Sequence, residues 1–229
     1  MVAKKVGEME EKQMLDNNEK LLKESLLLYA VTDRSWVGER SLYEQIEAAL
    51  RGGVTIVQLR EKNLSEEDFI AEAKKIKELC KGYGVPLIIN DNVDVALKSG
   101  AEGVHVGMED TPIQEIRQRA GEDFIIGATA KTVEQALAAQ EAGADYLGVG
   151  AVFPSPTKTN AIRITKADLK EICSAVRIPA VAIGGITYDN VDEIKGGGMA
   201  GIAVVSAVFG AKNIEKATGE LKGKIKGIL

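Results

Sequence analysis

The segment GADYLGVGAVFPSPTKTN, Gly143–Asn160, carries the pattern that decides the fold of this chain. Its first half contains a short apolar run, Asp145–Val149, which is typical of a buried strand. Gly148 and Gly150 lie two positions apart, so they face the same side of that strand. Two positions without side chains at a strand end let a ligand approach the backbone closely. We therefore expect a buried strand that delivers a ligand-binding loop.

The loop that follows the strand, Phe153–Thr159, has the composition of a phosphate-binding loop. Its two prolines stiffen the backbone and remove two N–H donors. Ser155, Thr157 and Lys158 supply hydroxyl and ammonium donors suited to phosphate oxygens. For this loop taken alone, an ordinary polar surface loop is an equally good interpretation.

The pattern of strand and helix extends along the chain in both directions. Eight apolar runs predict strands at Leu26–Thr32, Val54–Leu59, Leu87–Asn90, Gly103–Val106, Phe124–Ala128, Asp145–Val149, Ala180–Ile183 and Gly201–Val205. Helical patterns follow at Ser41–Arg51, Ser65–Lys81, Val93–Ser99, Ile113–Ala120, Thr132–Ala142, Lys166–Ala175, Tyr188–Lys195 and from about Asn213. Strict alternation predicts a parallel sheet covered on both faces. Eight units predict a closed (β/α)₈ TIM barrel, in the α/β class, as a single domain.

A doubly wound open sheet is the competing fold, but its glycine-rich fingerprint would follow the first strand. In this chain the glycine-rich turns follow later strands. Residues 25–229 are predicted to form the barrel, and residues 1–24 an N-terminal extension that is helical or mobile.

Composition limits the partners of the protein. The chain has 29 Lys and Arg against 34 Asp and Glu, with a net charge of −5 and no basic patch, which argues against nucleic acid. No apolar run reaches the length of a membrane span, and no secretory or transit signal is visible. Cys80 and Cys173 lie in helical patterns and indicate a reducing compartment. We expect a cytoplasmic protein that acts on small molecules, and a homo-oligomer is an open alternative.

Polar residues gather where the predicted strands end, which is the active face of a barrel. Gln58 and Arg60 share the inward face of the second strand, and a buried arginine is costly unless an anion meets it. Asp91 and Asp110 follow neighbouring strands, so their carboxylates converge. Oxygen ligands without His or Cys suit Mg²⁺. The alternatives are a helix N-cap for Asp91 and a helix-start residue for Asp110.

Arg60 is joined by two further cations, Lys62 and Lys158, that can clamp the same anion. A second anion site is predicted at Gly185, Val205 and Ser206, because barrels bind phosphate through backbone N–H groups after their last two strands. A metal-assisted site fits a diphosphate and a metal-free site fits a monophosphate. The two sites predict a transferase that joins two phosphorylated substrates and releases diphosphate.

His105 is the only histidine in the chain, and it lies deeper in the fourth strand than the loop residues. We expect it to be a hydrogen-bonded core residue. With one histidine in this setting, a nucleophilic triad is disfavoured.

Five motifs resemble the thiamine-phosphate synthase family and follow its order: QLREK at Gln58–Lys62, IND at Ile89–Asp91, GVHVGMED at Gly103–Asp110, GVGAVFPSPTK at Gly148–Lys158 and AIGGIT at Ala182–Thr187. The resemblance covers nearly the whole barrel but not residues 1–24. It implies that the protein couples 4-amino-5-hydroxymethyl-2-methylpyrimidine diphosphate to 4-methyl-5-(2-phosphoethyl)thiazole. The products would be thiamine monophosphate and diphosphate. The cofactor would be Mg²⁺, and the thiazole nitrogen would capture a pyrimidine carbocation.

By matching positions, the resemblance also implies roles for individual residues. The pyrimidine diphosphate would be held by Gln58, Leu59, Arg60, Glu61, Lys62, Asn90, Thr129 and Lys158. The thiazole phosphate would be held by Ser155, Pro156, Thr157, Gly185, Val205 and Ser206. Asp91 and Asp110 would hold Mg²⁺, and Arg60, Lys62 and Lys158 would be catalytic.

The chain departs from the family pattern at a few positions. The stretch that the family reads as GVSAHT is GATAKT here, so Thr129 replaces a serine and Lys131 a histidine. Ser155 stands where threonine is common. Two alternatives are a thiazole tautomerase-like relative, which lacks the diphosphate and metal residues, and a non-catalytic protein that binds thiamine phosphates.

Overall fold

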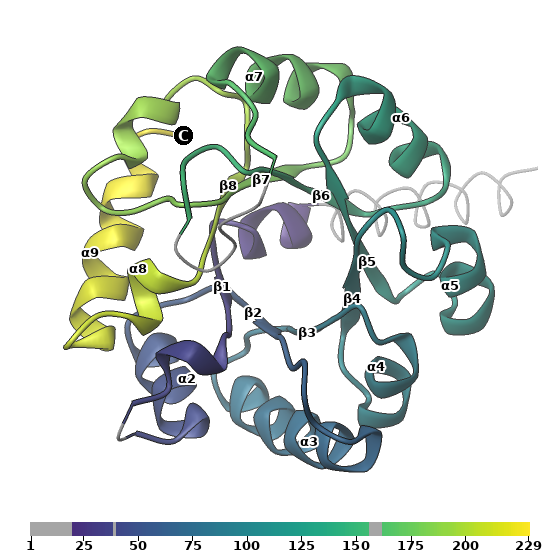
Figure 1. Cartoon of the computed structure of the whole chain (residues 1–229), viewed down its shortest axis with the longest axis vertical. Helices are drawn as coiled ribbons and strands as arrows, with labels where there is room; N and C mark the ends of the chain where they lie inside the picture. Colours follow the sequence, from purple (N-terminus) through teal and green to yellow (C-terminus); the bar gives the residue numbers. More distant parts are fainter. Residues whose placement is uncertain (1–19, 39, 156–161) are drawn as a thin grey trace, which may run out of the picture.

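The computed structural model describes residues 20–38, 40–155 and 162–229. Eight parallel strands form a closed barrel, in which each strand pairs with its sequence neighbours and β8 pairs with β1 (Figure 1). The strands are β1 (Leu28–Val31), β2 (Ile56–Leu59), β3 (Leu87–Asn90), β4 (Gly103–Val106), β5 (Ile125–Ala130), β6 (Tyr146–Gly150), β7 (Ala180–Ile183) and β8 (Gly201–Val204). The predicted TIM barrel is confirmed, and the doubly wound alternative is excluded.

Helices surround the barrel in a ring (Figure 1). They are α2 (Leu42–Arg51), α3 (Glu66–Gly82), α4 (Val93–Ser99), α5 (Ile113–Ala120), α6 (Val133–Glu141), α7 (Lys166–Ala175), α8 (Ser206–Phe209) and α9 (Ile214–Lys226), with 3₁₀ turns η1 (Arg34–Trp36) and η2 (Val191–Ile194). Several begin at the predicted caps. The Ser41 hydroxyl accepts from the N–H of Glu44 in a capping box, and Ser65 accepts from the N–H of Asp68.

Strand alternation divides the interior into two apolar layers. Residues such as Leu28, Val57 and Leu59 pack between the strands and the helices. The intervening positions point into the barrel, where Tyr29, Ile88 and Tyr146 belong to a smaller cluster. The period of two along each strand produces this division. The inner layer therefore forms the base on which the site is built.

Two predictions about local structure are wrong. The segment Tyr188–Lys195 does not form an α-helix and contains only the 3₁₀ turn η2, which ends at Ile194, two residues before the glycines Gly196–Gly198. The carboxamide of Asn190 binds the loop instead, accepting from Thr187 N at 2.8 Å and donating to Gly185 O at 2.9 Å. Strand β5 runs two residues beyond the predicted Ala128, so Thr129 lies inside the ladder opposite Gly148.

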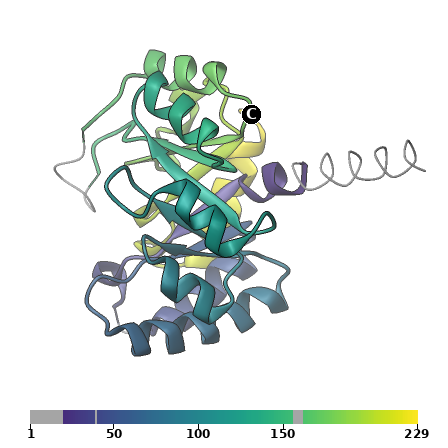
Figure 2. The same ribbon diagram turned by 90° about the vertical axis from the view of Figure 1, so that its right-hand side faces the viewer.

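Residues 20–25 form a short helical segment at the end of the barrel where the strands begin (Figure 2). Leu22 packs against the inner cluster, and its carbonyl accepts a hydrogen bond from Leu26 N at 3.1 Å. This part of the predicted extension therefore covers the bottom of the barrel, while residues 1–19 lie outside the described residues. Within the described part of the chain, no helix is long and apolar enough to cross a membrane.

Candidate functional site

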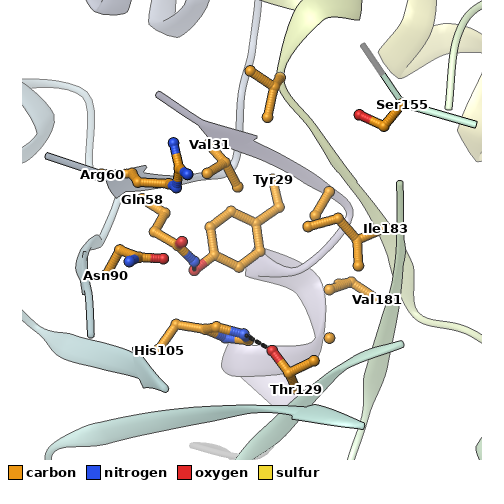
Figure 3. Close-up of a pocket in the computed structure, with 13 residues that line it drawn as sticks. Tyr29, Val31, Gln58, Arg60, Asn90, His105, Thr129, Ser155, Val181 and Ile183 are labelled. Carbon is orange, nitrogen blue, oxygen red and sulfur yellow. Dashed lines mark hydrogen bonds between the residues drawn. The ribbon is translucent and has the colours of Figure 1, made fainter. Parts of the chain in front are cut away.

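A cavity of about 190 Å³ lies inside the barrel, and side chains from most of the strands line it (Figure 3). Its lining residues are Tyr29, Val31, Gln58, Arg60, Asn90, His105, Thr129, Gly148, Ser155, Val181, Ile183, Ala203 and Val205. Six of these were predicted from the sequence as site residues: Gln58, Arg60, Asn90, Thr129, Ser155 and Val205. The barrel thus brings these six residues together, although they lie up to 147 positions apart in a chain of 229.

Arg60 is held by the strand next to its own. Its Nη1 donates to Asp33 Oδ2 at 2.5 Å, and its backbone N–H donates to Thr32 Oγ1 at 2.9 Å. Burial acts to raise the pKa of Asp33, but hydrogen bonds from Ser35 and the charge of Arg60 outweigh it and lower that pKa. The anion that the half-buried arginine requires is therefore supplied by Asp33, which orients the guanidinium at the cavity.

A chain of hydrogen bonds crosses the bottom of the cavity. Gln58 Nε2 donates to the Tyr29 hydroxyl at 2.8 Å, and the hydroxyls of Tyr29 and Tyr146 are 2.7 Å apart. Tyr146 Oη lies 3.1 Å from His105 Nδ1, and His105 Nε2 lies 3.1 Å from Thr129 Oγ1. Burial lowers the pKa of His105 to about 4, although the charge of Asp110 opposes it. His105 is hydrogen-bonded as predicted, but it is only partly buried and lines the cavity.

Asp91 and Asp110 come together on the loops that follow β3 and β4. Asp91 has φ 61°, a left-handed conformation that aspartate tolerates better than most residues, and its N–H donates to His105 O at 2.9 Å. Asp110 Oδ2 accepts from Gly107 N at 2.7 Å. Burial and the nearby Asp110 carboxylate raise the pKa of Asp91 to about 6, against the effects of Asn90 and Arg60. The two carboxylates repel each other, and a bound cation would relieve this repulsion.

The structure excludes the alternative roles of these two residues. Asn92, not Asp91, is the N-cap of α4, and its Oδ1 accepts from Val95 N at 2.9 Å. Helix α5 begins only at Ile113, after an N-cap at Pro112, so Asp110 does not start it. No cluster of three or more His, Cys, Asp or Glu side chains that suits a metal occurs among residues 20–38, 40–155 and 162–229. A carboxylate pair fits Mg²⁺, which uses one or two carboxylates and completes its shell with water and substrate phosphate.

A smaller pocket adjoins the cavity at the ends of β7 and β8. It is lined by Ser155, Ile183, Gly184, Gly185, Ile186, Ala203, Val204, Val205 and Ser206. Gly185 has φ 63°, and a Cβ there would lie 2.1 Å from Pro154 O, so only glycine fits. Within the described part of the chain, the N–H groups of Gly185 and Ser206 have no hydrogen-bond acceptor. These two donors make the pocket suitable for a phosphate.

The spacing of the two glycines of β6 predicted that both let a ligand approach the backbone. In the structure the two glycines have different functions. A Cβ on Gly148 would lie 3.0 Å from His105 Cε1, so this glycine accommodates the imidazole at the cavity wall. A Cβ on Gly150 would lie 2.0 Å from Ile183 O, so this glycine allows β6 and β7 to approach each other. Only Gly148 lines the cavity.

Several predicted residues do not line the cavity. Leu59 points into the layer between strands and helices. Glu61 accepts from Arg34 Nε at 2.7 Å, its side chain is 2% exposed, and its Oε1 has no partner in the described structure. Lys62 is exposed. Pro156, Thr157 and Lys158 lie outside the described residues, and their proposed roles rest on the sequence.

Four residues that shape the site were not predicted from the sequence: Asp33, Tyr29, Tyr146 and Asn190. Tyr29 and Tyr146 had a detectable signal, because they occupy inward positions of short strands among otherwise aliphatic residues. Asp33 follows its strand directly, like the polar residues at the other strand ends. Asn190 had no signal, because its contacts depend on the 3₁₀ turn that replaces the predicted helix.

The fold and the site together define a TIM-barrel enzyme with a pair of neighbouring carboxylates and a polar cavity that adjoins a smaller glycine-lined pocket. The family model described as thiamine monophosphate synthase matches residues 28–208. The thiamine-phosphate synthase of Clostridium tetani (strain Massachusetts / E88) is 50% identical over 196 residues, which is 86% of this chain and 94% of that protein. Thiamine-phosphate synthase 2 of Streptococcus pneumoniae serotype 4 is 47% identical over 207 residues, 90% of this chain and 99% of that protein.

The solved structure of a thiamine phosphate pyrophosphorylase from Pyrococcus furiosus superposes with a TM-score of 0.83 at 40% identity, over 91% of this chain and 99% of that one. The chain belongs to the thiamine monophosphate synthase family.

Proposed function

We propose that the protein is a thiamine-phosphate synthase that couples 4-amino-5-hydroxymethyl-2-methylpyrimidine diphosphate to 4-methyl-5-(2-phosphoethyl)thiazole. The observation that carries this proposal is the continuity of the barrel cavity with the smaller pocket at the ends of β7 and β8. Ser155, Ile183, Ala203 and Val205 line both the cavity and the phosphate pocket. A pyrimidine in the cavity and a thiazole phosphate anchored in the pocket would therefore meet without crossing solvent.

The reaction breaks the C–O bond between the pyrimidine methylene and the diphosphate, and the diphosphate leaves with the electron pair. The lone pair of the thiazole nitrogen then forms the new C–N bond. Arg60, oriented by Asp33, would stabilise the growing negative charge on the diphosphate. Asp91 and Asp110 would hold Mg²⁺, which neutralises charge on the leaving oxygens when it is bound. No general base is needed, because the nucleophile is a neutral ring nitrogen.

Lys158 would complete the charge stabilisation, and this assignment rests on the motif alone. A lysine that follows the diphosphate as it leaves acts mainly in the transition state. Lys158→Ala should therefore lower the single-turnover rate at saturating substrates and Mg²⁺ by about 10²–10³-fold. Lys158→Arg should restore it only in part. A variant with a normal rate and only weaker substrate binding would contradict this role.

Diphosphate release from the two substrates with Mg²⁺ tests the proposal. Wild-type protein should release one diphosphate per thiamine monophosphate formed, and Asp110→Asn should abolish turnover while retaining the fold. Asp123→Asn, at an exposed aspartate before β5, is a control that makes the same charge change. Folded protein that binds both substrates but releases no diphosphate would favour the non-catalytic binding protein. We further propose a cytoplasmic location, supported by two free cysteines, Cys80 and Cys173.

A further inference from the structure

The five side chains at the bottom of the cavity form a hydrogen-bond chain whose direction has consequences for the ligand. It runs from Gln58 through Tyr29, Tyr146 and His105 to Thr129, and its four donor–acceptor distances lie between 2.7 and 3.1 Å. Gln58 and Thr129, at the two ends, line the cavity. Tyr29 is 1% exposed and Tyr146 is fully buried. The inner members of the chain must therefore satisfy each other.

Every inner member of the chain is neutral near pH 7. Burial raises the pKa of Tyr29 and of Tyr146 well above the usual range of a phenol. The two ring nitrogens of His105 contact hydroxyl groups and, within the described structure, no carboxylate, so no ion pair favours the charged imidazolium. Each phenol then has one proton to donate, and the imidazole has a single N–H. The number of protons in the chain is therefore fixed.

With that number of protons, the direction of one bond determines the direction of the others. Gln58 donates to Tyr29, so the Tyr29 hydroxyl directs its own proton to Tyr146. Tyr146 in turn donates to Nδ1 of His105, which leaves the imidazole proton on Nε2. His105 then donates to Thr129 Oγ1, and the Thr129 proton is available to the cavity. The reverse direction at Tyr146 would leave a buried Tyr29 proton without an acceptor, at a cost of about 1–3 kcal/mol.

The strands around the chain leave room for it. A Cβ on Gly127 would lie 2.1 Å from Tyr146 Cζ and 2.5 Å from His105 Nδ1. A Cβ on Gly148 would lie 3.0 Å from His105 Cε1. Two missing side chains on β5 and β6 thus admit the Tyr146–His105 pair, an observation independent of the hydrogen bonds.

We propose that Tyr29, Tyr146 and His105 are positioning residues that fix the hydrogen-bonding pattern of the cavity, with the Gln58 carbonyl as acceptor and the Thr129 hydroxyl as donor. The matching ligand is a heteroaromatic ring with an amine donor and ring-nitrogen acceptors. This proposal rests on the proposed function and deepens it. An aminopyrimidine has the matching pattern, whereas its 4-oxo analogue replaces the amine with an acceptor and one ring-nitrogen acceptor with an N–H donor.

The single histidine allows a direct test without substrate. Nitrogen-15 labelling of histidine gives one imidazole, whose tautomer is read from its two nitrogen resonances. Wild-type protein should show the proton on Nε2 and a bare Nδ1 at about pH 8, because an imidazole is neutral well above its ordinary pKa. Tyr146→Phe removes the donor to Nδ1 and should produce a mixture of tautomers. If the His105 imidazole of the wild-type protein carried its proton on Nδ1, the proposal would be overturned.

Substrate discrimination is the second measurement. The ratio of kcat/KM for the 4-amino to the 4-oxo pyrimidine diphosphate should fall by about tenfold or more in Tyr146→Phe, since sites built for a hydrogen bond discriminate strongly by it. Ile88→Val is the control, because Ile88 is fully buried in the same inner cluster and does not line the cavity. It should leave tautomer and ratio unchanged.

The possible failures are distinguishable. An unchanged tautomer and ratio in Tyr146→Phe would overturn the proposal, and if that variant does not fold, the wild-type tautomer still decides. An Nε2–H tautomer in a protein that couples neither pyrimidine would refute the proposed function and leave the direction of the chain supported.

Discussion

Asp91 and Asp110 are expected to destabilise the metal-free protein at neutral pH, and Asp91→Asn should relieve this. The pKa of Asp91 is raised from 3.8 to about 6 by burial and by the neighbouring carboxylate. Because the pKa of the Asp91 carboxyl is higher in the folded than in the unfolded state, protonated Asp91 favours the folded state. This contribution is fully present below pH 3.8. That contribution is lost as the pH rises through 6. Asparagine removes the charge and tolerates the positive φ of this position.

The magnitude follows from the size of the shift. A shift of about two pKa units corresponds to about 3 kcal/mol at about 1.4 kcal/mol per unit. Because the Asp91 side chain is only partly withdrawn from water, solvent screening reduces the effect to about 1 kcal/mol. For a protein of this size, about 1 kcal/mol moves Tm by about 2–4 °C.

Thermal unfolding in chelator-treated buffer at pH 7.5 and pH 3.5 measures the effect. Asp91→Asn should unfold at higher temperature than wild type at pH 7.5 and at the same temperature at pH 3.5. Mg²⁺ should stabilise wild type more than Asp91→Asn, since the cation also relieves the repulsion. Asp123→Asn controls for net charge. Equal Tm values of Asp91→Asn and wild type at pH 7.5, or an equal gain at both pH values, would refute the reasoning.

Three further predictions concern the cavity and the barrel. Thr129→Ser should keep most coupling activity and Thr129→Val should lose at least about tenfold in kcat/KM, because valine removes the hydroxyl at similar volume; equal activities would show that the hydroxyl contacts no substrate. Gly127→Ala should cost about 3 kcal/mol or prevent folding in denaturant titrations, because its Cβ would overlap Tyr146. Gly82→Ala, where a Cβ meets nothing within 4 Å, should be neutral or stabilising, and a similar loss in both would contradict the steric argument. Deleting residues 1–24 should lower the unfolding free energy by about 1 kcal/mol, since it removes the half-buried Leu22, whereas deleting residues 1–19 leaves that contact in place. Neither truncation should change kcat/KM, and a loss of activity in both would assign the segment a role in the site.

The alternation of apolar runs and helical patterns was sufficient to determine the barrel. Strand and helix periodicity are local properties, and the only closed arrangement of eight parallel strands with helices between them is a barrel. The identical bounds of the predicted and observed β3, β4 and β7 reflect this. The ends of the strands also located Gln58, Arg60, Asn90 and the aspartates, because all strand ends of a barrel meet on one face.

The tertiary structure decided which of these residues face the cavity and what each one contacts. Glu61 shares a motif with Arg60, yet it pairs with Arg34 because its side chain lies on the other face of the strand end. Arg60 finds its counter-ion in Asp33, 27 residues away on the neighbouring strand. Tyr29 and Tyr146 are 117 residues apart, and their contact exists only after β1 and β6 are placed across one barrel. Local patterns determine the elements, whereas a hydrogen bond between distant strands depends on barrel closure and register, which no short stretch of sequence contains.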